Sequence, residues 1–144
     1  MTTMPQLLAD APADAAANPS PRRVLVIDDS LTVRLFCTSL LTPAGFAVAE
    51  AINGLEALEQ ALEERFDLFV VDINMQKMDG YTFLAEARRR PELCAIPAVM
   101  LSTEQAGEDI ARAYRAGTNF YLPKPIDPDR FIATVQLMTG VPCR

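Results

Sequence analysis

Five polar residues of this chain are of the types that magnesium-dependent phosphoryl chemistry requires: Asp28, Asp29, Asp72, Ser102 and Lys124. Carboxylates are ligands for hard divalent cations, and an aspartate is also a competent nucleophile towards phosphorus. A hydroxyl group and an ammonium group are suited to binding phosphoryl oxygens. Each of the five ends or directly follows a short apolar run, so the elements that these runs form decide whether the five residues meet.

The apolar runs alternate with helical segments along most of the chain. Short runs rich in β-branched residues predict strands at residues 23–27, 46–51, 66–72, 96–102 and 119–123. Apolar residues at helical spacing predict helices at residues 30–45, 53–65, 81–90, 107–117 and 127–140. Strands and helices that alternate in this way form βαβ units. We therefore expect a doubly wound α/β domain, in which a five-stranded parallel sheet has helices on both faces.

The polar residues stand at the carboxyl ends of the predicted strands. Asp28 and Asp29 follow the first strand, Asp72 ends the third, Ser102 ends the fourth, Lys124 follows the fifth, and the second offers no comparable residue. All carboxyl ends of a parallel sheet lie on one edge, where ligands bind. Carboxylates that meet there raise one another's pKa, and a divalent cation resolves the conflict. We therefore expect Mg²⁺ between the acids, although residue types alone do not choose which aspartate receives a phosphoryl group.

Each of these residues has an ordinary structural explanation when it is considered alone. Asp28 and Asp29 could cap the helix that follows them, and Ser102 could cap the next one. Lys124 alone would be a solvated surface lysine. The arginines at 88–90 are expected to form a solvated helix end, where their charge suits the helix dipole.

Composition narrows the class of protein. The 144 residues include 19 acidic and 13 basic ones, and the net charge of −6 argues against a nucleic-acid-binding surface. No apolar run approaches the ~20 residues of a membrane span, and the first residues lack the pattern of a signal peptide. The chain contains no histidine, which removes His-based catalysis, His metal ligands and phosphohistidine.

The cysteines and the chain ends suggest a location and an organisation. Cys37, Cys94 and Cys143 fit neither a zinc nor a disulfide pattern, and this favours a reducing cytoplasm. Residues 1–21 are rich in Ala, Pro and Asp and are expected to be a flexible tail. Residues 22–140 are expected to form one domain, followed by a short tail at 141–144, so that any output is a protein–protein contact.

Four motifs carry a resemblance to a known family: "IDDS", "VVDINMQKMDG", "VMLST" and "YLPKP". In these motifs and in their spacing, the chain from about residue 22 to 140 resembles the receiver domain of two-component response regulators, in particular the single-domain, CheY-like type of chemotaxis. The resemblance implies a flavodoxin-like sheet of strand order 2-1-3-4-5. In that order the first and third strands are neighbours, so the three aspartates would face one another.

The resemblance also assigns roles to residues. It implies that Asp72 is the phosphoacceptor and belongs to a Mg²⁺ site completed by Asp28, Asp29 and the backbone carbonyl of Asn74.

Three further residues resemble those that respond to the phosphoryl group. Ser102 resembles a switch hydroxyl that turns inward, and Tyr121 resembles the aromatic switch. Lys124 resembles the lysine that pairs with the phosphoryl group, and its bond to Pro125 is implied to be cis.

Two positions depart from the family pattern. Gln76 stands where proline is frequent, and Thr103 stands where a small residue is common. Asn74 and Glu104, at two positions thought to tune self-hydrolysis, match the chemotaxis type. We therefore expect a short-lived phosphate, with Thr103 favouring a longer lifetime.

The function implied by the resemblance is that of a signalling phosphoacceptor rather than an enzyme. A histidine kinase would phosphorylate Asp72 with Mg²⁺ present, and self-dephosphorylation would reverse the reaction. The phosphorylated form would bind a protein partner, such as a motor switch or a phosphorelay component, through the face at residues of about 105 to 138.

Two alternatives stay open. One is a Mg²⁺-dependent phosphatase or phosphotransferase with an aspartyl-phosphate intermediate, although such enzymes prefer a D-x-D pair to the adjacent Asp28 and Asp29. The other is an unphosphorylated interaction module of the same fold, which would usually have lost an acid or the lysine.

Overall fold

The computed structural model describes residues 20–104 and 106–140. Most of the tail expected at 1–21 therefore lies outside the described residues, as do the expected C-terminal tail at 141–144 and Cys143. Within the described part, none of the helices is both long and apolar enough to cross a membrane.

Five strands form one parallel sheet: β1 (Arg23–Ile27), β2 (Ala47–Ala51), β3 (Leu68–Asp72), β4 (Ala98–Ser102) and β5 (Phe120–Pro123). Their order across the sheet is β2-β1-β3-β4-β5, with every neighbouring pair parallel. Both the parallel sheet and the strand order are as expected. β1 and β3 are neighbours, so the residues that follow them emerge side by side at one edge.

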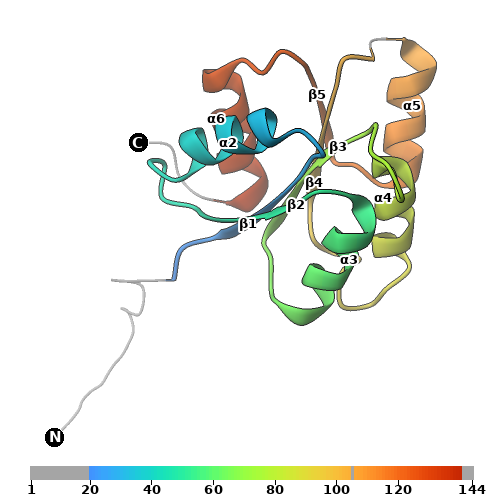
Figure 1. The fold of residues 1–144 in the computed structure, drawn as a ribbon, viewed down its shortest axis with the longest axis horizontal. Helices are drawn as coiled ribbons and strands as arrows, with labels where there is room; N and C mark the ends of the chain where they lie inside the picture. Colours follow the sequence, from blue (N-terminus) through green and yellow to red (C-terminus); the bar gives the residue numbers. More distant parts are fainter. Residues whose placement is uncertain (1–19, 105, 141–144) are drawn as a thin grey trace, which may run out of the picture.

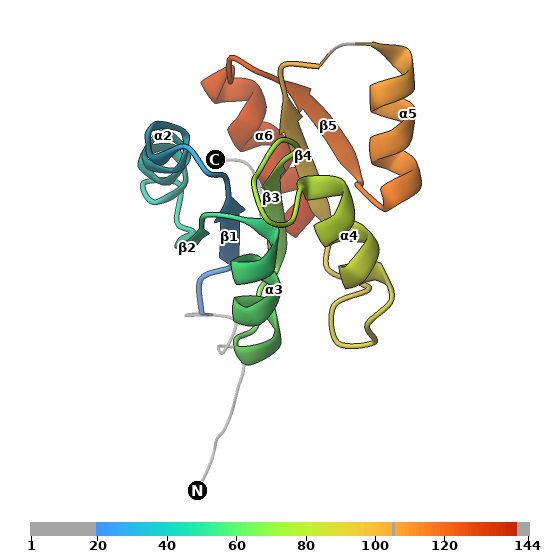
Figure 2. The same cartoon turned by 45° about the vertical axis from the view of Figure 1, so that its right-hand side comes forward.

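The described residues form five helices: α2 (Leu31–Leu41), α3 (Gly54–Glu63), α4 (Gly80–Arg88), α5 (Gly107–Ala116) and α6 (Pro128–Thr139). The first four connect successive strands, and α6 follows β5. Figures 1 and 2 show α2 and α6 on one face of the sheet and α3, α4 and α5 on the other. This arrangement confirms the doubly wound α/β fold.

The two faces of the sheet have separate hydrophobic cores, and the alternation along β1 illustrates the division. Val24 and Val26 pack in the cluster that includes residues of α2 and α6. Leu25 and Ile27 pack in the cluster that includes residues of α3, α4 and α5. All four are fully buried, and burying such a side chain contributes on the order of 2 kcal/mol. The buried sheet is thus a rigid base for the residues at its carboxyl edge.

The helix after β1 is shorter than the sequence predicts. α2 ends at Leu41, where the amide of Thr42 still bonds to the carbonyl of Thr38. Pro43 then has no amide hydrogen to continue the ladder, and Gly45 has a positive φ of 98°. Residues 42–45 therefore form a turn instead of the last helical turn that was predicted.

The expectation for the arginines at 88–90 is wrong for Arg88. Its guanidinium donates hydrogen bonds of 2.8 and 3.0 Å to the carbonyl of Gly117 and one of 2.6 Å to that of Ile96. It also donates to the carbonyls of Leu93 and Cys94. Arg88 therefore joins the end of α4 to the loops before β4 and β5, and burial lowers its pKa.

Candidate functional site

The site lies at the carboxyl edge of the sheet. Asp28 directly follows β1, Asp72 is the last residue of β3, Ser102 is the last residue of β4, and Lys124 directly follows β5. Carboxylate oxygens of Asp28, Asp29 and Asp72 all lie within 4.8 Å of one another. The structure thus brings Asp72 next to Asp28 and Asp29, which follow a different strand.

Lys124 joins two of these acids. Its ammonium lies 3.0 Å from Oδ2 of Asp28 and 2.9 Å from Oδ1 of Asp72. The backbone amide of Lys124 bonds to the carbonyl of Ser102 at 2.9 Å, and the peptide bond to Pro125 is cis. The loop after β5 is therefore held against the end of β4, and the lysine lies between the acids.

Asp28 is held in place from several sides. Its side chain is almost fully buried, and Oδ1 accepts a hydrogen bond of 2.9 Å from the amide of Ser30. Its own amide donates to the carbonyl of Ala51 in β2. Asp29, next in the chain, is exposed. The two adjacent acids therefore differ, since one is fixed by protein contacts and the other faces solvent.

Burial and neighbouring charges act on Asp72 and Lys124 in opposite ways. Burial raises the pKa of Asp72, Asp28 and Asp29 raise it further, and Lys124 opposes them without reversing the shift. Burial alone would lower the pKa of Lys124, but its hydrogen bonds to Asp72 and Asp28 outweigh this, and the pKa is raised. Without a further cation, the carboxyl group of Asp72 is thus less easily ionised than an ordinary aspartate.

The donor set fits Mg²⁺. This ion prefers oxygen ligands, often one or two carboxylates with water and phosphate oxygens completing the shell. Asp28, Asp29 and Asp72 supply such oxygens, and a divalent cation would oppose the burial and the charge repulsion that raise the pKa of Asp72. Asn74, two residues beyond Asp72, is exposed, and its carbonyl as a fourth ligand stays a prediction.

The two residues expected to act as a switch meet at the backbone of Glu104. The hydroxyl oxygen of Ser102 accepts a hydrogen bond of 2.9 Å from the amide of Glu104. The hydroxyl of Tyr121 donates one of 2.5 Å to the carbonyl of the same residue. Both side chains are buried. The segment after β4 therefore connects the end of the sheet to the ring of Tyr121.

A largely buried arginine contacts the backbone of Asp28, and the sequence analysis did not identify it. Arg34 of α2 donates a hydrogen bond of 2.7 Å to the carbonyl of Asp28 and one of 2.9 Å to Oε1 of Glu50. Its side chain is only 11% exposed. An arginine early in a helix is ordinarily solvated, so no signal in the sequence alone marks this role.

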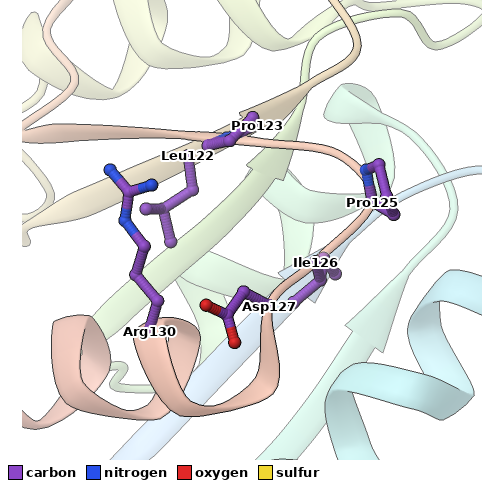
Figure 3. A pocket seen from close by; sticks show the side chains of 6 residues that line it. All are labelled: Leu122, Pro123, Pro125, Ile126, Asp127 and Arg130. Atoms are coloured by element: carbon purple, nitrogen blue, oxygen red, sulfur yellow. The ribbon is translucent and has the colours of Figure 1, made fainter.

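A small hollow lies beside the loop that carries Lys124. Figure 3 shows it between Leu122 and Pro123 of β5 and Asp127 and Arg130 at the start of α6. Its volume of about 20 Å³ suits a single water molecule. This hollow is therefore a feature of packing and is no candidate for a ligand site.

The fold and site have parallels among known proteins. A family model described as the response regulator receiver domain matches residues 24–136. The sensor histidine kinase CheAY of Helicobacter pylori is 37% identical over 120 residues, which cover 82% of this chain and 15% of that protein. The chemotaxis protein CheY4 of Vibrio cholerae has a similar structure, with a TM-score of 0.78 at 33% identity over 82% of this chain and 98% of that one.

A third similar structure contains a magnesium ion. The receiver domain of the sensor histidine kinase PA1611 of Pseudomonas aeruginosa, with a magnesium ion coordinated in its active site cleft, shares the fold at a TM-score of 0.78 and 23% identity. The match covers 83% of this chain and 98% of that one. Several relatives are much longer: the chain spans 15% of the Helicobacter pylori kinase and 51% to 54% of two probable transcriptional regulators.

Proposed function

This chain belongs to the response regulator receiver domain family, and we propose that Asp72 accepts a phosphoryl group from a sensor histidine kinase in a Mg²⁺-dependent reaction. The phosphorylated form then binds a protein partner, and self-dephosphorylation ends the signal. The observation that carries the proposal is the meeting of three carboxylates and one ammonium group at the edge of the sheet. A cytoplasmic location, which the cysteine content favours, is part of the same proposal.

Asp72 is the best candidate for the acceptor because of its position among the acids. It is the last residue of the central strand β3, and Lys124 contacts one of its oxygens. Asp28 is already held by the amide of Ser30 and by Lys124. Asp29 is exposed and two strands away from Ser102. Asp72 thus combines a carboxylate held by Lys124 with a position on the strand that pairs directly with β4.

The transfer needs an ionised nucleophile and a means of neutralising the phosphoryl oxygens. An oxygen of Asp72 forms a bond to phosphorus while the bond from phosphorus to the donor nitrogen of phosphohistidine breaks, and that nitrogen keeps the electron pair. The hydrogen bond from Lys124 favours the ionised form of Asp72, and the ammonium group can then pair with a phosphoryl oxygen. The hydroxyl group of Ser102 can donate to another of these oxygens.

Asp28, Asp29, Asp72 and the carbonyl of Asn74 would hold the metal. When bound, Mg²⁺ supplies Lewis-acid stabilisation of the charge on the transferring phosphoryl group. The magnesium ion in the active site cleft of the Pseudomonas aeruginosa receiver domain supports this part of the proposal.

The proposed output surface is the face formed by α5, β5 and α6. β5 is one of the two edge strands of the sheet, and Figure 2 shows it between α5 and α6. A phosphoryl group on Asp72 adds about −1.5 to −2 charges at pH 7, and these favour a hydroxyl donor from Ser102. If Ser102 turns towards the phosphoryl group, its bond to the amide of Glu104 is lost, and the anchor of Tyr121 changes with it.

Intact mass spectrometry tests the proposal. The purified chain is incubated with Mg²⁺ and a small phosphodonor such as acetyl phosphate, beside Asp72→Asn and the exposed control Asp129→Asn. Wild type and Asp129→Asn should gain one phosphoryl mass, Asp72→Asn should gain none, and EDTA should prevent the gain. A wild type without any gain would favour an interaction module, and a gain by Asp72→Asn would place the acceptor elsewhere. Turnover of a phosphate ester would indicate a phosphatase.

A further inference from the structure

We propose that the corner between β2 and α3, residues 50–54, positions both halves of the acidic site. One half is the turn that carries Asp28 and Asp29, and the other is the loop of residues 73–79 after Asp72. The position of this loop depends on Gly54. The proposal rests on the function given above, because it concerns how the metal-binding residues are held. The corner itself places no side chain in the cluster of acids. Its contacts instead hold in place the two halves of the site.

The first half of the site is tied to the start of this corner. The amide of Asp28 bonds to the carbonyl of Ala51 at 3.1 Å. Arg34 bridges the carbonyl of Asp28 and the carboxylate of Glu50, and Gln60 donates a hydrogen bond of 2.8 Å to the carbonyl of Glu50. The turn that carries Asp28 and Asp29 is therefore fixed relative to β2 by both backbone and side-chain bonds.

The second half is tied to the end of the corner. The amide of Gly54 bonds to the carbonyl of Met78 at 2.9 Å, and Met78 packs on the core beneath it. A Cβ atom on Gly54 would lie 2.7 Å from both Cγ and the carbonyl oxygen of Met78. Contacts this short do not occur, so any side chain at 54 would push the loop away. The absence of a side chain at Gly54 is what lets the loop of residues 73–79 dock.

The docked loop is closed by a hydrogen bond at its base and strained at its tip. A displacement of Met78 is therefore expected to shift the other residues of the loop. At its base the amide of Gly80 bonds to the carbonyl of Ile73 at 2.9 Å. At its tip Lys77 has a φ of 70°, and the amide of Met78 bonds to the carbonyl of Gln76 at 2.8 Å, which makes a γ-turn. Such turns with positive φ are rare and strained, and persist where surrounding contacts impose them. The bond and packing at Gly54 are such contacts.

The corner is itself rigid enough to serve as a reference. Asn53 caps α3, since its side chain accepts a hydrogen bond of 2.8 Å from the amide of Glu56. Glu56 in turn accepts one of 3.0 Å from the amide of Ile52. An open cavity of about 380 Å³ lies between the two halves, lined by Asp29, Arg34, Ile52, Asn53, Gln76 and Lys77. The acidic turn, the corner and the strained loop thus form three walls of one space.

Gly54→Ala tests the proposal, and Gly107→Ala is a matched control. Both glycines are the first residue of a helix, but a Cβ atom at Gly107 would meet nothing within 4 Å. Mg²⁺ affinity is measured by isothermal titration calorimetry, and the melting temperature is measured in EDTA. Gly54→Ala should bind Mg²⁺ about tenfold or more weakly, as expected when the support of a metal ligand is disturbed. Gly107→Ala should bind within twofold of wild type.

A second variant keeps the test decisive if Gly54→Ala does not fold. Met78→Ala retains the carbonyl that accepts from Gly54 but removes the packing, and Mg²⁺ affinity should fall a few-fold with little change in melting temperature. If both single variants fold, their losses should be less than additive in the double variant, because they disturb one contact.

The outcomes separate this inference from the proposed function. A folded Gly54→Ala that binds Mg²⁺ within twofold of wild type overturns the inference, and so does an equal loss in Gly107→Ala. If only Met78→Ala folds, unchanged Mg²⁺ affinity overturns it. A wild type that neither binds Mg²⁺ nor gains a phosphoryl group overturns the proposed function as well. A wild type that does both, with variants that match it, overturns the positioning role alone.

Discussion

The ammonium group of Lys124 lies 2.9 Å from a carboxylate oxygen of Asp72, although 52 residues separate the two in the chain. The same group also contacts Asp28, and the three side chains are 17%, 8% and 3% exposed. In the absence of a metal ion, this lysine is a positive charge in direct contact with both buried acids. Its position suggests that it stabilises the metal-free protein as well as serving the proposed transfer.

Replacing Lys124 by methionine should destabilise the metal-free protein and make it more dependent on Mg²⁺. Without the ammonium group, two buried carboxylates lose their partner, and such a loss costs about 3 kcal/mol in free energy of unfolding. Mg²⁺ should restore much of this stability, because it replaces the missing charge. Chemical denaturation in EDTA and in Mg²⁺ measures both effects. Arg65→Met removes an exposed cation between α3 and β3 and should change neither; an equally stable Lys124→Met in EDTA would contradict the prediction.

The raised pKa of Asp72 predicts a specific pH dependence of the metal-free protein. The folded state holds a proton on Asp72 above the ordinary aspartate pKa of ~3.9, at which the unfolded chain releases it. The stabilising contribution is therefore complete below that pKa and is lost as the pH rises through the raised value. In EDTA, the melting temperature of wild type relative to Asp72→Asn should fall across this window. A difference that rises with pH would mean that Lys124 lowers the pKa of Asp72 overall.

Mg²⁺ binding should show the opposite trend over the same window. The ion binds the ionised carboxylate and competes with the proton. Its affinity should therefore increase as the pH rises through the raised pKa of Asp72, and calorimetric titrations at several pH values measure this directly. An affinity that does not change with pH would show that Asp72 is not a ligand.

Much of the fold was predictable because the pattern that specifies it is local. Each strand is a short apolar run between polar turns, and β1, with residues buried on both faces, is the clearest case. The acids at strand ends were predictable for the same reason, since a parallel sheet brings all its carboxyl ends to one edge. The strand order came from the resemblance to receiver domains, and the structure agrees with it.

Contacts that depend on tertiary packing were not predictable. Arg88 belongs to a run of three arginines at a helix end, and nothing in that run distinguishes it from its exposed neighbour Arg89. Arg34 and Gly54 have similarly ordinary local sequences. Their contributions arise only where α2, the corner before α3 and the loop after Asp72 meet, and these segments are distant in the chain.

Arg88 should contribute substantially to stability. It donates hydrogen bonds to carbonyl groups of two loops, including two to Gly117. Arg88→Met keeps the aliphatic stem but leaves these carbonyls without their donor, which should lower the free energy of unfolding by about 2 kcal/mol. Arg89→Met removes an exposed arginine and should cost less than about 0.5 kcal/mol. Urea denaturation compares the two, and equal stabilities would show that the bonds of Arg88 are replaced by water.

The hydroxyl group of Tyr121 should control the mobility of the segment after β4. Tyr121→Phe removes the hydrogen bond to the carbonyl of Glu104 while keeping the buried ring. The free energy of unfolding should fall by only about 1 kcal/mol, but amide hydrogen exchange in the peptide between β4 and α5 should become several-fold faster. Tyr114→Phe removes a hydroxyl group from an exposed tyrosine of α5 and should leave exchange unchanged. If Tyr121→Phe exchanges at the wild-type rate, the tyrosine does not anchor this segment and the proposed route from Ser102 to the outer face loses its middle step.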